Sequence, residues 1–274
     1  MRAEVVIITG ASSGFGRLAA LEAARRGYRV VALARRAERL AALARAIEAT
    51  GGTVLTVAGD VTRAEDQERL IAAALERFGR IDALVNNAGV PLAGGFAQVS
   101  VADLRRQWET NVLAVIELTR RALPALMRTR GVVVNVGSLA GHFSFPGWGL
   151  YYPSKVAVRS ISDALRRELA AYGVRVALLE PGPYRTEFAQ QAGLPDPGSF
   201  GLDPTPVGRA IVDLIEHPRR LRMMPGWMWL PTTIGAALVA AAPVVVDWLM
   251  VQWTRRQQRL RTTAAADAPQ QDAP

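Results

Sequence analysis

The sequence predicts an α/β fold, a doubly wound parallel sheet in a single domain, followed by an apolar C-terminal extension. Three observations predict it. Short β-branched apolar runs recur along the chain, longer helical stretches separate them, and 274 residues suit one large α/β domain. Apolar runs without polar alternation are typical of strands that helices cover on both faces of a parallel sheet.

The predicted elements alternate along the first four fifths of the chain. The strands are expected at 5–9, 28–34, 53–58, 83–86, 132–136 and 174–179, with a short seventh strand near 220–224. The helices between them are expected at 17–26, 38–49, 65–78, 101–127 and 154–172. This order, strand then helix, predicts the crossover connections of a doubly wound sheet.

Composition excludes several classes of function. The chain has no cysteine, which excludes disulfides, zinc–thiolate sites and thiol catalysis. Its two histidines, His142 and His217, lie far apart in sequence, so no metal site is predicted. The formal charge is +9, but the arginines are spread over helical stretches beside acidic residues, and no nucleic-acid partner is expected.

A glycine-rich turn follows the first predicted strand. It reads Gly-Ala-Ser-Ser-Gly-Phe-Gly over 10–16 and leads directly into a predicted helix. Glycines in this place allow a tight turn, a close approach of the backbone to a pyrophosphate, and a helix N-terminus directed at its charge. The predicted dinucleotide contacts in this turn are Gly10, Ser12, Ser13, Gly14, Phe15 and Gly16.

The end of the second strand bears on the choice of cofactor. A fold that selects NAD usually places an acidic residue there to accept the ribose 2′-hydroxyl. Here the strand ends in Arg35 and Arg36, and Glu38 is the first acid. The planar fork of arginine suits a 2′-phosphate. NADP(H) is therefore the predicted cofactor through Arg35, with Arg36 and Arg17 as secondary candidates, and NAD(H) is the alternative.

A tyrosine and a lysine are spaced to act together. Tyr151 and Lys155 stand four residues apart, which puts a phenol and an ammonium on one helical face. Lys155 is the only lysine among 33 basic residues. A free phenol titrates near ~10, and a neighbouring cation can lower its pKa toward neutrality. Tyr151 is then a proton donor to a developing alkoxide, and Ser138, at the end of the fifth strand, can polarise the substrate oxygen.

Together these motifs resemble the short-chain dehydrogenase/reductase family in its short, single-domain form. The matching features are the TGxxxGxG turn, Asn-Asn-Ala-Gly at 86–89, Ser138 and YxxxK, in the family's order and spacing. The resemblance extends over 4–225. It implies a Rossmann fold and an oxidoreductase that transfers hydride between NADP(H) and a CH–OH or C=O group. It also implies that Lys155 binds the nicotinamide ribose and that Asn111 completes a catalytic tetrad by positioning a water.

The resemblance also assigns further residues to the cofactor. It implies that Asp60 and Val61 hold the adenine and that Asn86 braces the sheet. The remaining cofactor contacts implied are Asn87, Ala88, Gly89, Pro181, Gly182 and Thr186. The family usually forms dimers or tetramers, so a homodimer or homotetramer is expected. The alternative functions are a catalytically silent dinucleotide-binding regulator or scaffold, a sugar-nucleotide epimerase or dehydratase, and a membrane-anchored interaction protein.

Two further segments of the sequence predict how the substrate is enclosed and what kind of substrate it is. We expect a catalytic domain over 1–225, in which 184–208, rich in proline and glycine, forms a substrate lid or an ordinary surface connection. Phe143, Phe145 and Trp148 predict an apolar pocket wall and therefore an apolar carbonyl or alcohol substrate. His142 is interpreted as a hydrogen-bonded loop histidine rather than a substrate contact.

The C-terminal extension, 226–261, is almost uncharged from 227 to 253, where Asp247 is the only ionised residue and tryptophans stand at both ends. It is interpreted as a pocket or oligomer-interface cover, a peripheral membrane contact or a true span, although two prolines interrupt it. No signal peptide is expected, and the predicted location is cytoplasmic, with membrane association as the alternative. Residues 262–274 predict a disordered tail.

Overall fold

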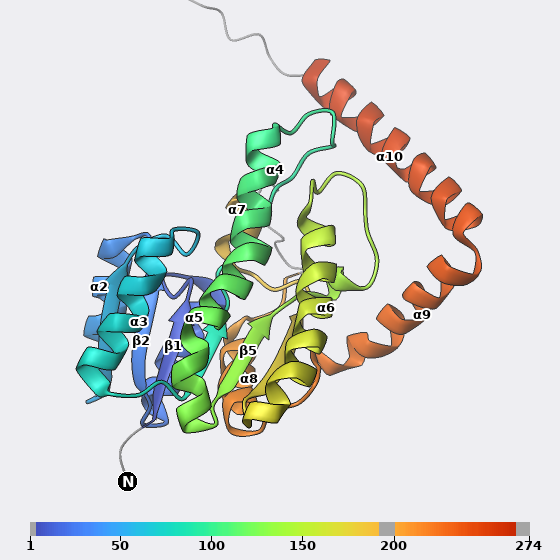
Figure 1. The fold of residues 1–274 in the computed structure, drawn as a ribbon. Helices are drawn as coiled ribbons and strands as arrows, with labels where there is room; N and C mark the ends of the chain where they lie inside the picture. The colour runs from blue at the N-terminus through green and yellow to red at the C-terminus, as the bar shows by residue number, and fades with distance from the viewer. Residues whose placement is uncertain (1–3, 192–200, 267–274) are drawn as a thin grey trace, which may run out of the picture.

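A sheet of seven parallel strands forms the centre of the molecule in the computed structural model, which describes residues 4–191 and 201–266. The spatial order is β3-β2-β1-β4-β5-β6-β7 (Figure 1). The strands are β1 Val5–Thr9, β2 Arg29–Ala34, β3 Thr53–Ala58, β4 Ala83–Asn86, β5 Val132–Val136, β6 Arg175–Pro181 and β7 Arg222–Met224. The predicted fold class is confirmed, because the order reverses between β1 and β4 as in a doubly wound sheet.

Helices cover both faces of the sheet. They are α1 Gly14–Arg25, α2 Ala37–Glu48, α3 Ala64–Phe78, α4 Val101–Trp108, α5 Ala114–Thr129, α6 Tyr151–Leu169, α7 Glu187–Gln191, α8 Thr205–Glu216, α9 Trp229–Ala241 and α10 Pro243–Ala266. Alternate residues of β1 enter two different cores: Val6 and Ile8 pack with α1, α2 and α8, whereas Val5 and Ile7 pack with α3 and α5. Strands buried on both faces explain why the runs are apolar throughout.

The helix predicted over 101–127 is not continuous. A π-helical turn, Glu109–Leu113, separates α4 from α5 and contains Asn111. The Asn111 amide donates to the backbone oxygen of Val90 and to Ser154 Oγ, at 3.0 and 3.1 Å, and its Oδ1 accepts from the Val90 nitrogen at 2.8 Å. These bonds hold the turn against the segment that follows β4 and against α6. A single π turn within a helix is commonly found at functional sites.

The predicted lid and tail segments both contain helical residues, while their roles stay predictions. Within 184–208, the short helix α7 is present, and the last residues form the first turn of α8, where Pro206 suits a helix start. Residues 192–200 lie outside the described residues. Helix α10 continues through Ala266, into the segment predicted as disordered, because its last residues include three alanines with high helix propensity. Residues 267–274 also lie outside the described part.

The last two helices form an arm that leaves the body of the molecule (Figure 1). We use the name C-terminal arm for residues 226–256, which comprise the 3-10 turn Gly226–Met228, α9 and the described side chains of α10. No single helix in the described part of the chain has the length and apolar character to cross a bilayer. The two helices of the arm have the necessary length and apolar character only when taken together, and a bend of 109° separates them.

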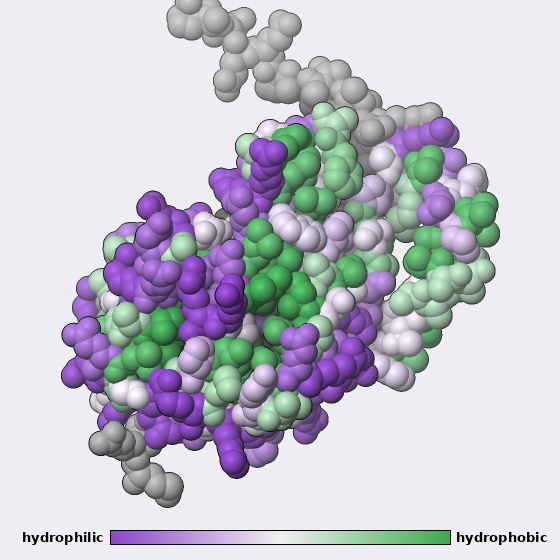
Figure 2. Space-filling model, viewed as in Figure 1, coloured by the Kyte–Doolittle hydropathy of each residue, from purple (hydrophilic) through white to green (hydrophobic). Residues whose placement is uncertain are grey.

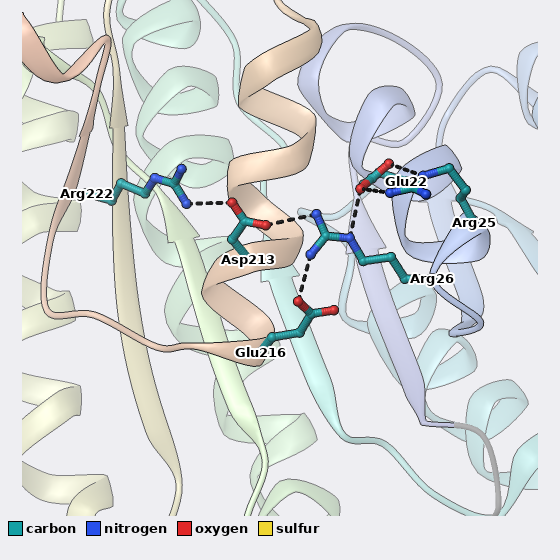
Figure 3. Close-up of polar contacts among 6 residues, drawn as sticks. All are labelled: Glu22, Arg25, Arg26, Asp213, Glu216 and Arg222. Carbon is teal, nitrogen blue, oxygen red and sulfur yellow. Dashed lines mark hydrogen bonds and ion pairs between the residues drawn. The ribbon is translucent and has the colours of Figure 1, made fainter.

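An ion-pair network joins α1 to α8 at the back of the sheet (Figure 3). The guanidinium of Arg26 donates to Glu22 Oε1 at 2.8 Å, to Asp213 Oδ1 at 2.8 Å and to Glu216 Oε2 at 2.7 Å. Arg25 donates two further bonds to Glu22, but its side chain is 70% exposed. These bonds, first of all those from Arg25, lower the pKa of Glu22 to about 2, although burial acts in the opposite direction.

We expect Arg26→Met to lower the free energy of unfolding by about 1–2 kcal/mol, because it removes the ion pairs that join Glu22 of α1 to Asp213 and Glu216 of α8. Arg25→Met is the matched control and should lose clearly less stability than Arg26→Met, as expected of an exposed pair within one helix. Urea unfolding of the two variants measures the difference, and equal losses would contradict a bridging role. The lowered pKa of Glu22 contributes stability that is present above about 4.5 and is lost as the pH falls toward 2.

Candidate active site

The carboxyl ends of the central strands open into a cavity of about 650 Å³. The predicted site residues that line it are Gly10, Ser12, Ser13, Gly14, Phe15, Arg35, Asp60, Val61, Asn87, Ala88, Gly89, Ser138, Tyr151, Lys155, Pro181, Gly182 and Thr186. Gly16 and Asn111, also predicted as site residues, are not among the residues that line the cavity. Among the described residues, no group of three or more histidine, aspartate and glutamate side chains is placed to hold a metal ion.

The glycine turn positions a bare helix N-terminus at one end of the cavity. Gly14 begins α1 with φ +51°, in the left-handed region that favours glycine. Ser13 caps the helix without a side-chain hydrogen bond, and the first turn carries no acidic residue. The first backbone N–H groups of α1 therefore remain available for an anion. A Cβ at Gly16 would come within 2.5 Å of Asn87 Nδ2, so this glycine acts through close packing.

The Asn-Asn-Ala-Gly segment ties neighbouring strands together beneath the cavity. Asn86 Nδ2 donates to Asn135 Oδ1 on β5 at 2.9 Å and to Thr119 Oγ1 on α5 at 3.0 Å. Thr9 Oγ1, at the end of β1, accepts from the backbone nitrogens of Asn87 and Ala88, each at 3.0 Å. Asn86 therefore braces the sheet as expected, and the backbone of the next residues is held at the cavity wall.

Arg36, rather than Arg35, lies over the glycine turn. Its guanidinium donates to Ser13 Oγ at 2.7 Å and to Ser12 Oγ at 3.1 Å. The side chain of Arg35 is 63% exposed, and its nearest carboxylate is that of Asp60, at 3.8 Å. A cluster of one guanidinium and two hydroxyl groups beside a helix N-terminus provides donors for a phosphate. From the sequence, Arg35 is the first candidate for this role and Arg36 a secondary one.

Glu187, on α7, also belongs to this end of the cavity. Its carboxylate accepts from Arg36 Nη1 at 3.0 Å and forms a second ion pair with Arg39. Hydrogen bonding from Arg39, followed by that from Arg36, lowers the pKa of Glu187. The carboxylate thus contributes negative charge at this end. No local sequence pattern marks Glu187, because its partners lie about 150 positions earlier in the chain.

Asp60 and Thr186, two of the predicted cofactor contacts, both line the cavity. Asp60 Oδ1 accepts from the backbone nitrogen and hydroxyl of Thr62, at 3.0 and 2.9 Å, which fixes the carboxylate at the end of β3. Thr186 packs on the glycine turn, 3.7 Å from where a Cβ of Gly14 would lie. The residues of this cavity therefore fit an extended dinucleotide, from Asp60 past the helix N-terminus to Thr186.

Tyr151 and Lys155 come together on the first turn of α6, as the spacing predicts. Lys155 Nζ lies 5.8 Å from the centre of the Tyr151 ring and donates to the backbone oxygen of Val136 at 3.1 Å. Burial lowers the pKa of Lys155 to about 8, so its ammonium stays charged at neutral pH. Burial raises the pKa of Tyr151, while hydrogen bonding to Ser138 lowers it. In the protein without cofactor, the phenol is therefore protonated.

Ser138 and Asn111 are the other two residues of the predicted tetrad. Ser138 Oγ accepts from the Ala140 nitrogen at 3.1 Å and faces the backbone oxygen of Pro181 at 3.5 Å. Asn111 reaches α6 through Ser154, the residue before the lysine, and its side chain is 2% exposed. Both amide hydrogens of Asn111 are used by its bonds to Val90 and Ser154, and its part in positioning a water stays a prediction.

Aromatic side chains form the wall beside Tyr151. The rings of Trp148 and Phe188 lie 5.5 and 5.4 Å from the Tyr151 ring, and Phe143 and Met228 complete this wall. Phe145, expected in the wall, packs behind it against Phe143 at 5.3 Å. Phe188 comes from α7 and Met228 from the C-terminal arm. No sequence motif marks either residue, because both reach the cavity only through tertiary packing.

His142 is fully engaged in hydrogen bonds, as interpreted from the sequence. Its Nε2 lies 2.6 Å from Glu180 Oε2 and its Nδ1 lies 2.6 Å from Arg159 Nη1. The imidazole thus lies between the carboxylate of Glu180 and the guanidinium of Arg159. The cluster is buried below the loop that carries Ser138 and holds that loop against β6.

A doubly wound sheet whose cavity gathers a glycine turn, a serine and a tyrosine–lysine pair defines a Rossmann-fold oxidoreductase. A family model described as short chain dehydrogenase matches residues 4–195. The chain is 39% identical over 184 residues to serine 3-dehydrogenase of Agrobacterium fabrum, which covers 67% of this chain and 73% of that protein. The chain therefore belongs to the short-chain dehydrogenase/reductase family.

Solved structures agree with this family. A short chain dehydrogenase/reductase from Burkholderia phymatum in complex with NAD matches with TM-score 0.81 and 27% identity, over 87% of this chain and 94% of that one. A short-chain dehydrogenase from Sphingobium yanoikuyae in complex with NADPH matches with TM-score 0.74 and 28% identity, over 99% and 98% of the two chains. The neighbours include complexes with either cofactor.

Proposed function

We propose that this protein is an NADP(H)-dependent oxidoreductase that interconverts an apolar carbonyl compound and its alcohol. The observation that carries the proposal is one continuous cavity. At one end it presents Arg36 with Ser12 and Ser13, and at the other Tyr151 with Lys155 and Ser138. An aromatic wall flanks the second end. Phosphate recognition, proton transfer and apolar binding are thus available along a single extended ligand path.

In this proposal the protein residues handle the substrate oxygen and its proton, and the bound nicotinamide supplies or accepts hydride. Ser138 donates a hydrogen bond to the substrate oxygen and orients the carbonyl beside Tyr151. In the direction of reduction, the Tyr151 hydroxyl donates its proton to that oxygen as negative charge develops there. Lys155 stabilises the phenolate that is left, and hydrogen-bonds the ribose hydroxyls. Asn111 holds the π turn and α6 in register, which keeps the pair aligned.

Burial favours this assignment of the acid. It raises the pKa of Tyr151, so the phenol holds its proton until charge develops on the substrate oxygen. Lys155, with a pKa of about 8, supplies positive charge at neutral pH. Carbonyl reduction should therefore weaken as the pH rises through about 8, because the lysine loses its charge.

The preference for NADP(H) over NAD(H) is tested by the two adjacent arginines. We expect Arg36→Ala to raise the KM for NADPH by about 10- to 100-fold, because charge-assisted bonds contribute about 1.5–3 kcal/mol each. The KM for NADH should change by less than about 3-fold. Arg35→Ala is the matched control, and its KM for NADPH should rise by less than about 5-fold because that side chain is exposed. Steady-state kinetics with both cofactors measure this, and a larger effect from Arg35→Ala would restore the sequence-based ranking.

The apolar substrate class rests on the wall formed by Phe143, Trp148, Phe188 and Met228. Serine 3-dehydrogenase, by its name, acts on a polar amino acid. Such a substrate would need charged partners for its ammonium and carboxylate. In the described part of the cavity, the charged side chains other than Lys155 are Arg35, Arg36, Asp60 and Glu187, at the phosphate-binding end.

The deciding experiment is turnover of NADPH and NADH with a series of ketones and aldehydes of increasing chain length, and with serine. Oxidation of NADPH that improves with chain length supports the proposal. Preference for serine would contradict the substrate class. NADPH binding without turnover of any compound would favour the silent regulator, which retains the cavity but has no need for Tyr151 and Lys155 together.

The oligomeric state is a separate prediction. We expect a homodimer or a homotetramer, to be checked by light scattering.

A further inference from the structure

We propose that the C-terminal arm binds the surface of a lipid bilayer with anionic headgroups, and that the enzyme draws its substrate from that bilayer. The second half of this proposal rests on the proposed function, whereas the first half does not. Figure 2 shows the arm standing off from the body of the molecule, with pale and green apolar residues on its visible face.

The arm exposes large apolar side chains that a folded domain normally buries. Trp227 is 68% exposed and Val244 is 79% exposed. The exposed large apolar residues of the arm are Trp227, Trp229, Leu230, Ile234, Leu238, Val239, Val244, Val245, Trp248, Leu249, Val251 and Trp253. They make up more than half of all such residues in the described part of the chain. A contiguous exposed apolar surface of this kind marks an interaction site.

The distribution around each helix identifies a bilayer as the occupant. Residues nine apart on an α-helix lie on opposite sides, about 180° from one another. Leu230 and Val239 are such a pair on α9, and Val244 and Trp253 are such a pair on α10; all four are exposed. A second protein chain covers one face of a helix and leaves the other in water. Lipid can surround both faces, which is the environment that suits a helix apolar all around.

Length and charge indicate that the arm enters the outer part of the bilayer and does not cross the hydrocarbon core. Helix α9 has 13 residues and is thus about 20 Å long, shorter than the ~30 Å hydrocarbon core. Asp247 is exposed in the middle of the apolar part of α10. Its charge would be costly inside the hydrocarbon core but is tolerated at the level of the headgroups. Tryptophans suit that level. Arg255 and Arg256 follow directly and supply the positive charge that anionic headgroups attract.

The apolar surface of the arm is continuous with the catalytic cavity. Met228, at the start of the arm, lines the cavity together with Phe143. A Cβ at Gly235 of α9 would lie 3.8 Å from the Phe143 ring, and the Trp253 ring of α10 lies 6.5 Å from that of Phe145. Helix α9 thus contacts the aromatic wall at Phe143, and α10 contacts Phe145 directly behind that wall. An apolar molecule dissolved in the bilayer could then reach Tyr151 along this wall.

Binding is tested by flotation of the full-length protein with vesicles of phosphatidylcholine alone or mixed with phosphatidylserine. We expect binding that is at least about 10-fold stronger with phosphatidylserine, and a loss of about 10-fold or more in the double variant Leu238→Glu and Val245→Glu. Both side chains are exposed and neither lines the cavity. Tyr172→Glu, which adds a carboxylate at an exposed ring on the body, is the control and should bind as the native protein does.

Unchanged binding of the double variant would overturn the proposal. A native dimer that does not bind vesicles, and that becomes monomeric in the double variant, would also overturn it.

Substrate delivery is tested with a long-chain aldehyde held in vesicles and a short, water-soluble aldehyde. The double variant should lose turnover of the first by about 10-fold or more and keep that of the second. Equal loss of both, or loss of neither, would overturn delivery. If the native enzyme turns over no aldehyde, the proposed function fails, while flotation still decides whether the arm binds lipid.

Discussion

Tyr151→Phe should lower kcat for carbonyl reduction by about 1,000-fold, because it removes the only phenol that stands beside both Ser138 and Lys155 in the described part of the cavity. Proton donation from a positioned side chain contributes about 10²–10⁴ to such a rate. The ring itself is retained, so packing against Trp148 is preserved. NADPH binding, followed by cofactor fluorescence, should therefore change by less than about 3-fold.

Tyr152→Phe is the matched control for this experiment. Tyr152 is the adjacent phenol, its ring packs 5.9 Å from that of Tyr151, and the residue four positions later is Val156 rather than a lysine. Burial raises the pKa of Tyr152 to about 12, and no cation lies on its helical face at the spacing of Lys155 from Tyr151. Its variant should keep kcat within about 5-fold of the native value. A loss as large as that of Tyr151→Phe would show that the two phenols act together.

Lys155→Met should abolish most of the activity and at the same time stabilise the fold. Activity should fall by about 100-fold or more, since the phenol loses its neighbouring cation. The lysine is buried, and burial lowers its pKa from 10.5 to about 8, which corresponds to roughly 3 kcal/mol of destabilisation in the charged form. Methionine removes this cost but also the bond to Val136, about 1 kcal/mol. The melting temperature near neutral pH should rise by about 5 °C.

The pH dependence of stability gives a separate check on Lys155. Between about 8 and 10.5 the unfolded chain binds the lysine proton and the folded chain does not. The native protein should therefore become more stable, as far as this residue is concerned, as the pH rises through that window. Lys155→Met should lack this contribution. Thermal unfolding of both proteins across the window measures it, and a variant that melts lower than the native protein at neutral pH would contradict a buried, destabilising ammonium.

Much of the site could be predicted from the sequence because its signals are local. The glycine turn, the pair Tyr151 and Lys155, and Ser138 each depend on a spacing within one strand–turn–helix unit. Parallel strands place their carboxyl ends at one edge, so these units meet there without further information. Arg35 and Arg36 show the limit of this reasoning. Both follow β2, but the turn into α2 directs Arg36 over Ser12 and Ser13 and leaves Arg35 in solvent.

The sequence by itself thus determined the doubly wound sheet, the dinucleotide turn and the tyrosine–lysine pair, because periodicity and short spacings encode them. Only the tertiary structure decided which residues complete the cavity: Glu187 and Phe188 from α7, and Met228 from the C-terminal arm. It also decided that the arm projects with its apolar side chains exposed, whereas the sequence allowed a pocket cover, a membrane contact or a span. Contacts between segments distant along the chain depend on how helices pack, and neither composition nor periodicity records that packing.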